Sequence, residues 1–275
     1  DLRCSTLSET LRTGKFNCVT ATILYVCLCH EVGLEAWGVE IPAHVYAEVN
    51  DRGLPLRVET TCARWFELAE SDPATAEKHV PGRPDTTGAP YRQAAVEMPA
   101  ADAPRKLDAW QLVAIVYYNQ GVDYAERFDY AAAVAANHKA LKLDPASATA
   151  RKNLLGAINN WSLSLGDDGA YDQALSLLEH GRQLAPEHAT FATNLVALYQ
   201  RWVDELCRTR QYAQADAVVA AALRRHREPR LAAEQFVVYR RWGSYLVGAG
   251  QVDQALQLCA TIRNRHSGDP RAADA

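Results

Sequence analysis

The sequence has no excess of positive charge and no long apolar run. Its 29 Lys and Arg stand against 33 Asp and Glu, which gives a formal net charge of −4. A mildly acidic chain without a basic domain is a poor candidate for binding nucleic acid through the phosphates. No uninterrupted apolar stretch approaches the ~20 residues of a membrane-spanning helix. We therefore expect neither a nucleic-acid partner nor a membrane span in these residues.

Several motifs of familiar cofactor sites are also missing. The sequence has no glycine-rich phosphate loop and no HExxH zinc helix. Cys27, Cys29 and His30 are residue types that bind metals, but residues two apart on a helix point in nearly opposite directions and cannot close one tetrahedral site. We therefore predict no metal site here and expect Cys27 to be a core residue.

The cysteines do not suggest a disulfide framework. There are seven of them, an odd number, in 275 residues. This usage fits a reducing compartment, so we expect a cytoplasmic protein. The chain opens on Asp1, and we expect it to be a fragment. An exported or anchored full-length protein stays open, because a leader could precede these residues.

The second half of the chain, from about Lys106, is rich in alanine and repeats itself. Four segments align without gaps over their central parts: AERFDYAAAVAANHKALKLDP, DDGAYDQALSLLEHGRQLAP, RTRQYAQADAVVAAALRRHREP and GAGQVDQALQLCATIRNRHSGDP. Their shared alanines recur at intervals of 41, 41 and 40, at Ala133, Ala174, Ala215 and Ala255. A small residue in a second helix, a turn and a closing proline are typical of stacked helix–turn–helix units.

This half resembles the tetratricopeptide repeat (TPR) family, most closely in ALKLDP ending at Pro145. The family repeats every ~34 residues, whereas the alanines here recur every 40 or 41 residues. The additional length of about seven residues per repeat is close to two helical turns. We therefore predict an all-α TPR-type solenoid of about four repeats over 106–275, with elongated first helices. The resemblance implies a protein or peptide partner.

Residues 1–69 have a different pattern, which predicts an α+β domain. We expect a helix from Cys18 to Val32, with Asn17 as N-cap and Gly33 as the left-handed residue after its end. Three strands follow, connected partly by a turn over residues 51–53, at residues 35–41, 44–50 and 56–61. Residues 70–105 hold many prolines with little periodicity, and we interpret them as a connecting segment.

The spacing of the strands brings a histidine and a carboxylate together. If Asp51 and Arg52 form a two-residue turn, the apolar residues of both strands share one face and His44 lies opposite Glu59 on the other. Opposed side chains have Cβ atoms ~4.5–5.5 Å apart. A slip by one residue would mix the two faces, so we predict this register.

Cys18 is the candidate nucleophile that would complete such a site. A helix N-terminus lowers the pKa of a thiol, a histidine can take its proton, and an acid can orient the histidine. We therefore predict a catalytic triad of Cys18, His44 and Glu59. Thiol, imidazole and carboxylate suffice for acyl transfer, so no cofactor is implied.

The run GKFNCVTATILYVCLCHEVGLEAWGVEIPAHVYAEVNDRGLPLRVETT resembles the bacterial transglutaminase-like superfamily of papain-type cysteine enzymes. Cys18, His44 and Glu59 fall on its three catalytic positions, although many members have Asp in the third. The resemblance implies amide hydrolysis or acyl transfer, with a protease or amidase first and transamidation second. The Cys18 backbone N–H is the expected oxyanion donor, and the Asn17 side chain is a further candidate.

Two interpretations of the first domain remain open. It could be a relic without activity in a TPR adaptor, or the repeats could occlude its cleft. Substrate and oligomeric state are not indicated by the sequence.

Two features of the repeats are candidates for partner binding. Trp161, Trp202 and Trp242 recur at intervals of 41 and 40, where packing between helices is the alternative. Arg224 and Arg225 lie in a basic cluster that ends the third unit, where they would also complement the helix dipole.

Overall fold

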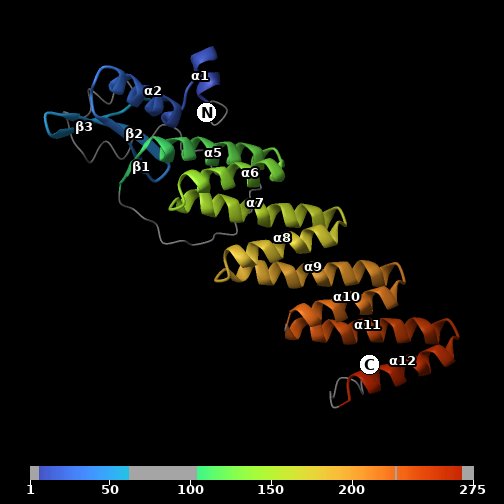
Figure 1. The fold of residues 1–275 in the computed structure, drawn as a ribbon. Coiled ribbons are helices and arrows are strands. Elements are labelled where there is room, and N and C mark those ends of the chain that lie inside the picture. Colours follow the sequence, from blue (N-terminus) through green and yellow to red (C-terminus); the bar gives the residue numbers. More distant parts are fainter. Residues whose placement is uncertain (1–5, 62–103, 227, 268–275) are drawn as a thin grey trace, which may run out of the picture. The chain divides into compact units, whose positions relative to one another are not determined.

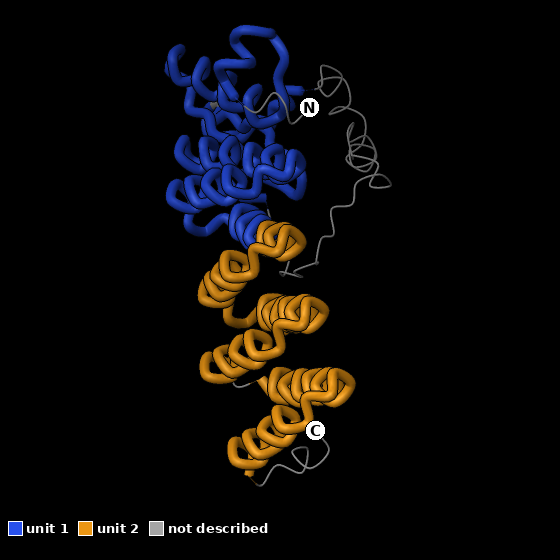
Figure 2. The backbone as a smooth tube through the Cα atoms, turned by 90° about the vertical axis from the view of Figure 1, so that its right-hand side faces the viewer, with its two compact units in different colours: residues 1–158 blue, residues 159–275 orange. Residues whose placement is uncertain are grey.

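The computed structural model describes residues 6–61, 104–226 and 228–267. By its internal contacts the chain divides into two units, residues 1–158 and 159–275 (Figure 2). A small antiparallel sheet with a few helices is followed by a helical region (Figure 1). The coarse fold class predicted from the sequence is therefore confirmed.

The first unit begins with two helices, α1 (Leu7–Thr13) and α2 (Cys18–Glu31). A meander of antiparallel strands follows: β1 (Ala36–Ile41), β2 (His44–Asp51) and β3 (Leu54–Val58). Most of the expected connecting segment and the last residues of the expected 1–69 domain lie outside the described residues.

Helix α2 begins and ends where its sequence predicts. The Oδ1 atom of Asn17 accepts hydrogen bonds from the N–H groups of Val19 and Thr20, and Thr20 Oγ1 accepts from the Asn17 N–H, which forms a capping box. Gly33 has a φ of 78°, and the Leu34 N–H donates to a carbonyl in the last turn.

The expected core role of Cys27 was wrong. Cys27 is exposed, and Cys29 is the buried cysteine of this helix. Because residues two apart lie on nearly opposite sides of a helix, only one of them faces the sheet. Cys29 packs with Val26 of the same helix and with Ala47 and Val58 of the strands.

The hairpin register differs by two residues from the prediction. Asp51 pairs with Leu54, so the turn residues are Arg52 and Gly53 and not Asp51 and Arg52. Both have positive φ, 52° and 89°, as a type I′ turn requires. The turn places its glycine at a left-handed position, and this preference decides the register.

A shift of two residues leaves every side chain on its predicted face. In the observed register Val58 lies opposite Ala47, whereas the predicted register had Val58 opposite Val45. The same register, continued past the end of β3, puts Glu59 opposite Tyr46. His44 and Glu59 are therefore diagonal neighbours, where the prediction had them directly opposed.

A short strand that the sequence did not predict completes the sheet. Strand β4 (Arg105–Leu107) pairs antiparallel with β1, and in the described residues the sheet order is β3-β2-β1-β4. The Lys106 ammonium also lies 3.0 Å from the centre of the Trp37 ring, a cation–π contact between the same two strands.

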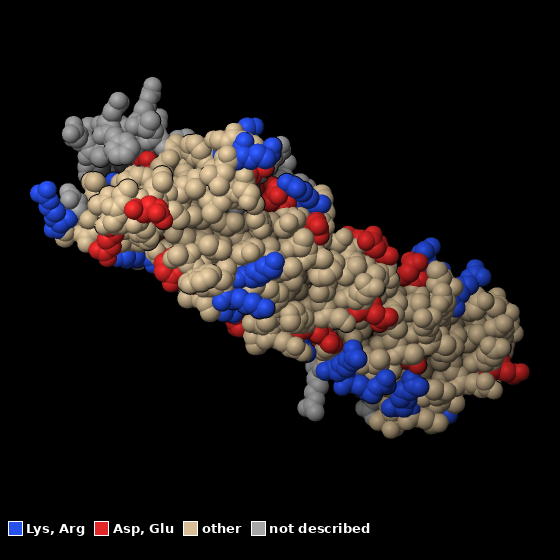
Figure 3. Space-filling model, turned by 45° about the horizontal axis from the view of Figure 1, so that its top comes forward, with Lys and Arg blue, Asp and Glu red and all other residues tan. Residues whose placement is uncertain are grey.

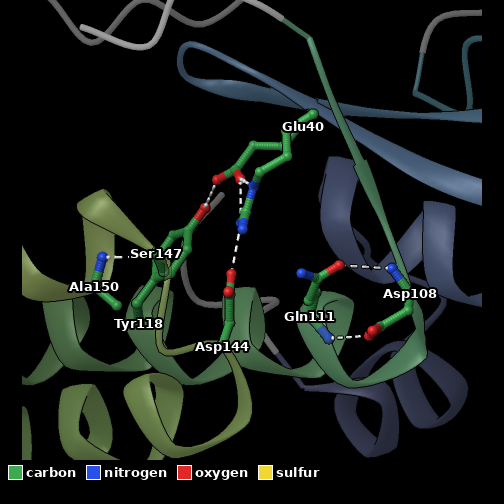
Figure 4. A network of polar contacts seen from close by, with 8 residues as sticks. Glu40, Asp108, Gln111, Tyr118, Asp144, Ser147 and Ala150 are labelled. Atoms are coloured by element: carbon green, nitrogen blue, oxygen red, sulfur yellow. Dashed lines mark hydrogen bonds and ion pairs between the residues drawn. The ribbon is translucent and has the colours of Figure 1, made fainter.

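A polar network fixes this sheet to the helices that follow it (Figure 4). The Arg105 guanidinium donates to Glu40 of β1 at 2.7 Å and to Asp144 at 2.6 Å. The Tyr118 hydroxyl donates to the other Glu40 oxygen at 2.9 Å. Burial and the neighbouring Glu40 carboxylate hold the pKa of Tyr118 above its ordinary value, so its hydroxyl stays a donor.

The core of the first unit packs the next helices against the sheet. Leu107 of β4, Leu112 and Ile115 are buried in one cluster with Val19 of α2 and Val45 of β2. Gly38 of β1 permits this approach, because a Cβ there would lie 2.5 Å from a methyl carbon of Leu112. The strand and the helix could not pack this closely with a larger residue.

The helical region alternates longer and shorter helices. The longer ones are α5 (Ala109–Glu126), α7 (Ala148–Asp167), α9 (Ala189–Arg208) and α11 (Pro229–Gly248). Each is followed by a helix of 14 residues: α6 (Tyr130–Leu143), α8 (Tyr171–Leu184), α10 (Tyr212–Arg225) and α12 (Val252–Arg265). The boundary between the two units lies within α7.

The repeated alanines are buried, as a small residue between packed helices should be. Each is the fourth residue of its shorter helix, and Ala133, Ala174 and Ala215 are fully inaccessible. Within residues 159–275, each helix of α8–α11 packs on the next, and α11 also packs on α9 and α12. Over the described ranges, every helix is too short or too polar to cross a bilayer.

Candidate active site

Cys18 is the first residue of α2, at the end that carries the positive pole of the helix. Its side chain is partly buried. The cap satisfies the N–H groups of Val19 and Thr20, and the Ala21 N–H donates to the Asn17 carbonyl. Within residues 6–61, the Cys18 N–H is thus the first-turn amide that no cap or helical bond occupies.

His44 and Glu59 form a hydrogen-bonded pair. The distance from His44 Nε2 to Glu59 Oε1 is 2.8 Å. Glu59 is only 6% exposed, and its other oxygen is 3.6 Å from the Arg57 guanidinium. Since a carboxylate accepts, Nε2 carries the proton of this bond and Nδ1 remains for the thiol.

His44 also interacts with the Cys18 thiol, and this interaction changes the pKa of both groups. Burial, the largest influence, would raise the pKa of the Cys18 thiol. Hydrogen bonds from His44 and the Val45 N–H, the His44 charge and the Val19 N–H outweigh it, so this pKa falls below its ordinary value.

The same contacts act in the opposite direction on the imidazole. Burial would lower the pKa of His44, but the hydrogen bonds to Cys18 and Glu59 and their negative charges raise it to about 9. A lowered thiol pKa and a raised imidazole pKa favour a thiolate–imidazolium pair near neutral pH.

The structure therefore brings the three predicted catalytic residues together, with His44 hydrogen-bonded to Glu59 and interacting with the Cys18 thiol. Carboxylate, imidazole and thiol follow one another in the order that nucleophilic catalysis requires. The contact is made although the predicted strand register was wrong, because a diagonal pair on one face is still within reach of long side chains.

Thr22 is a residue of this site that the sequence analysis missed. It is fully buried, and its Oγ1 lies 3.4 Å from the Val45 carbonyl and 3.1 Å from Thr60 Oγ1. Val45 follows His44 and Thr60 follows Glu59. The available signal was spacing, since Thr22 lies four residues after Cys18 and hence on the same face of the helix.

Asn17 acts mainly as the helix cap. Its Oδ1 is occupied by two backbone N–H groups, so only its Nδ2 could donate to an oxyanion. The role suggested by the sequence stays a prediction.

The predicted partner-binding residues lie elsewhere. Trp202 stacks on Tyr171 with ring centres 5.4 Å apart, and Trp242 stacks on Tyr212 at 6.4 Å. These rings are half-buried, as is Trp161, which favours the packing alternative. Arg224 and Arg225 are exposed at the end of α10.

In the portions of the chain that the structure describes, no group of three His, Cys, Asp or Glu side chains could hold a metal ion. Comparison with models of known protein families finds no match, and comparison with curated proteins finds none either.

Proposed function

We propose that the chain carries a cysteine-dependent acyl-transfer site, with Cys18 as nucleophile, His44 as acid and base, and Glu59 as the group that orients the imidazole. The observation that carries the proposal is His44 hydrogen-bonded to a buried carboxylate and interacting with a thiol at the N-terminus of a helix. A protease or amidase is the preferred activity, and transamidation by an amine acceptor is the second.

The first step forms a thioester. The Cys18 thiolate attacks the carbonyl carbon of an amide, and the electron pair of the carbonyl moves to its oxygen. The Cys18 N–H and the N-terminus of α2 would stabilise that oxyanion. When the tetrahedral intermediate collapses, the C–N bond breaks and the His44 imidazolium gives its proton to the leaving amine.

The second step releases the acyl group. Neutral His44 takes a proton from water, the hydroxide adds to the thioester carbon, and the C–S bond breaks. The products are a carboxylic acid and the regenerated thiolate–imidazolium pair. With an amine in place of water, the same steps yield a new amide.

We infer a role in partner binding for the helical region. The period near 40, the buried repeated alanines and the alternation of 20- and 14-residue helices support TPR-like units with long first helices. A partner held there could be the substrate.

The competing function is an adaptor without turnover. Its support is the capacity of the helical region for partner binding, which does not need the thiol. The two functions differ in whether Cys18 reacts with an electrophile that requires a working triad.

The test is labelling by a peptide vinyl sulfone, a substrate-like electrophile that reacts with catalytic thiolates. Peptide mapping by mass spectrometry reads out which cysteine is modified. We expect selective labelling of Cys18 in the full chain and loss of most of it in His44→Ala. Glu59→Gln should fall between the two.

The exposed Cys27 and Cys259 serve as internal controls in the same sample. If Cys18 is labelled no faster than these two, or if His44→Ala labels equally well, the adaptor is favoured. Incorporation of an added amine into the product then separates transamidation from amide hydrolysis.

A further inference from the structure

The helical unit contains a pocket of about 910 Å³ whose lining is dominated by arginine. It lies on α9, α11 and the turn before α10. Four of its ten lining residues are arginines, and Asp204 is the one acid among them. We call the set Arg208, Arg210, Arg240 and Arg241 the arginine pocket.

Two of the four cations have a carboxylate partner and two do not. Arg241 bonds Asp204 at 2.6 Å, and Arg208 pairs with Glu205. Arg210 lies over the Tyr245 ring, 5.4 Å from its centre. Within residues 159–226 and 228–267, no carboxylate lies at ion-pair distance from Arg210 or Arg240. Both are exposed.

The preceding repeat builds a corresponding pocket in which four acids outnumber the two arginines, Arg201 and Arg208. It has a volume of about 600 Å³ and includes Asp167, Gly169 and Tyr171. The residues 41 positions later in the sequence are Arg208, Arg210 and Tyr212. All three line the arginine pocket. Three corresponding positions therefore line both pockets, and the side chains at two of them differ in charge.

One of these replacements strains the backbone. Gly169 has a φ of 75° and Arg210 has a φ of 62°. Glycine adopts this conformation freely, whereas a side chain there costs free energy. The first repeat also has a non-glycine residue at this position, Phe128 with a φ of 63°, so the strain by itself does not point to the charge.

The pocket has the chemistry to hold carboxylates. Arginine presents fixed pairs of N–H donors that match a carboxylate group. Tyr212 stacks on Trp242 and lies against Tyr245, so the pocket has a rigid aromatic part beside its cations. On the face drawn in Figure 3, acidic and basic side chains are scattered, and several basic ones gather at its lower right.

We propose that the arginine pocket binds an acidic segment of a partner protein, with Asp or Glu side chains on Arg210 and Arg240 and the peptide packed on the tyrosines. This rests on the partner-binding part of the proposed function and gives it a chemical class. The neighbouring pocket shares Asp204 and Arg208 with this one, but its Asp167, Asp168 and Glu205 would repel further acids and so limit where the segment lies.

The experiment is fluorescence anisotropy on the full chain with a fluorescein-labelled peptide of eight glutamates in 50 mM salt. We expect saturable binding that Arg240→Glu weakens about tenfold or more, because a charge pair becomes a repulsion. Arg240→Gln should give a smaller loss. Arg230→Glu makes the same charge change on the same helix outside the pocket, and should leave the Kd within twofold.

Three results would overturn the proposal: no difference between Arg240→Glu and wild type, a loss in Arg224→Glu without one in Arg240→Glu, or equally tight binding of an eight-residue oligothymidylate. Circular dichroism confirms that each variant is folded. Cys18→Ala should bind the peptide normally. If Cys18 is labelled but the peptide does not bind, this inference alone is contradicted. If the peptide binds but Cys18 is not labelled, only the proposed activity is contradicted.

Discussion

Thr22 of helix α2 and Thr60, the residue after Glu59, share a hydrogen bond of 3.1 Å between their hydroxyls. The same Thr22 hydroxyl lies 3.4 Å from the carbonyl of Val45, the residue after His44. One buried side chain on the nucleophile helix thus holds the neighbours of both other triad residues. We therefore propose Thr22 as a positioning residue of the proposed triad.

Thr22→Val should slow the reaction of Cys18 more than it disturbs the fold. It removes both hydrogen bonds at nearly constant volume, and each is worth about 1 kcal/mol. We expect vinyl sulfone labelling of Cys18 to slow by roughly fivefold, which corresponds to about 1 kcal/mol of activation free energy. Thr22→Ser keeps the hydroxyl and should restore the rate. Equal slowing in both variants would contradict a positioning role.

Glu59→Gln should lower the pKa of His44 from about 9. Glutamine still accepts the Nε2 hydrogen bond but removes the negative charge that favours the imidazolium. NMR titration of the histidine ring protons measures this, with His44→Gln assigning the signal among the eight histidines. An unchanged pKa would show that Glu59 does not act on the ring electrostatically.

The raised pKa of His44 also predicts how the unfolding free energy of Glu59→Gln should compare with that of wild type as the pH changes. Because the folded pKa of His44 is raised, its contribution is fully present below the ordinary value of 6.5 and is lost as the pH rises through about 9. The difference in unfolding free energy between wild type and Glu59→Gln should therefore shrink across this window. A difference that grows with pH would have the wrong sign.

The turn of the β2–β3 hairpin offers a matched pair of substitutions. Gly53 and Arg52 both have positive φ. Gly53→Ala should lower the unfolding free energy by about 1 kcal/mol, because a Cβ is disfavoured in this conformation. Arg52→Asn should raise it by a few tenths, since asparagine tolerates left-handed φ. Thermal unfolding measures both changes in stability. If both variants shift the unfolding free energy in the same direction, the assigned turn is contradicted.

The partly buried Arg105 should contribute far more to stability than an exposed arginine. Asp144 is 2% exposed, and Arg105→Ala would leave its charge and that of Glu40 without their shared cation, at a cost of about 3–5 kcal/mol. Arg127→Ala breaks an exposed i,i+4 pair with Asp123 and should cost about 0.5 kcal/mol or less. Denaturant unfolding measures the loss of unfolding free energy in each variant. Similar losses in Arg105→Ala and Arg127→Ala would contradict a structural role for the network.

The sequence predicts features whose signals are local. The cap at Asn17 and the left-handed Gly33 bound helix α2, and the recurring alanines locate the shorter helices. Cys18, His44 and Glu59 could be placed in one site because strand alternation fixes the face of a side chain even when the register is two residues off.

Features that depend on distant partners were not predicted. Strand β4 is three residues long and pairs with residues more than 60 positions away. Glu40 and Arg105 are 65 residues apart, and no periodicity connects them. The turn was misassigned because Asp51 and Gly53 both favour turns, and the backbone geometry places Arg52 and Gly53 at its centre.

The most direct test of the triad is the rate of Cys18 alkylation by iodoacetamide as a function of pH, followed by mass spectrometry. Cys27 and Cys259 are exposed reference thiols in the same chain. The proposed ion pair predicts that Cys18 reacts at a near-constant rate from well below pH 8, and that His44→Ala abolishes this plateau. A Cys18 rate that rises with pH in parallel with the two reference thiols, and is unchanged in His44→Ala, would contradict the proposal.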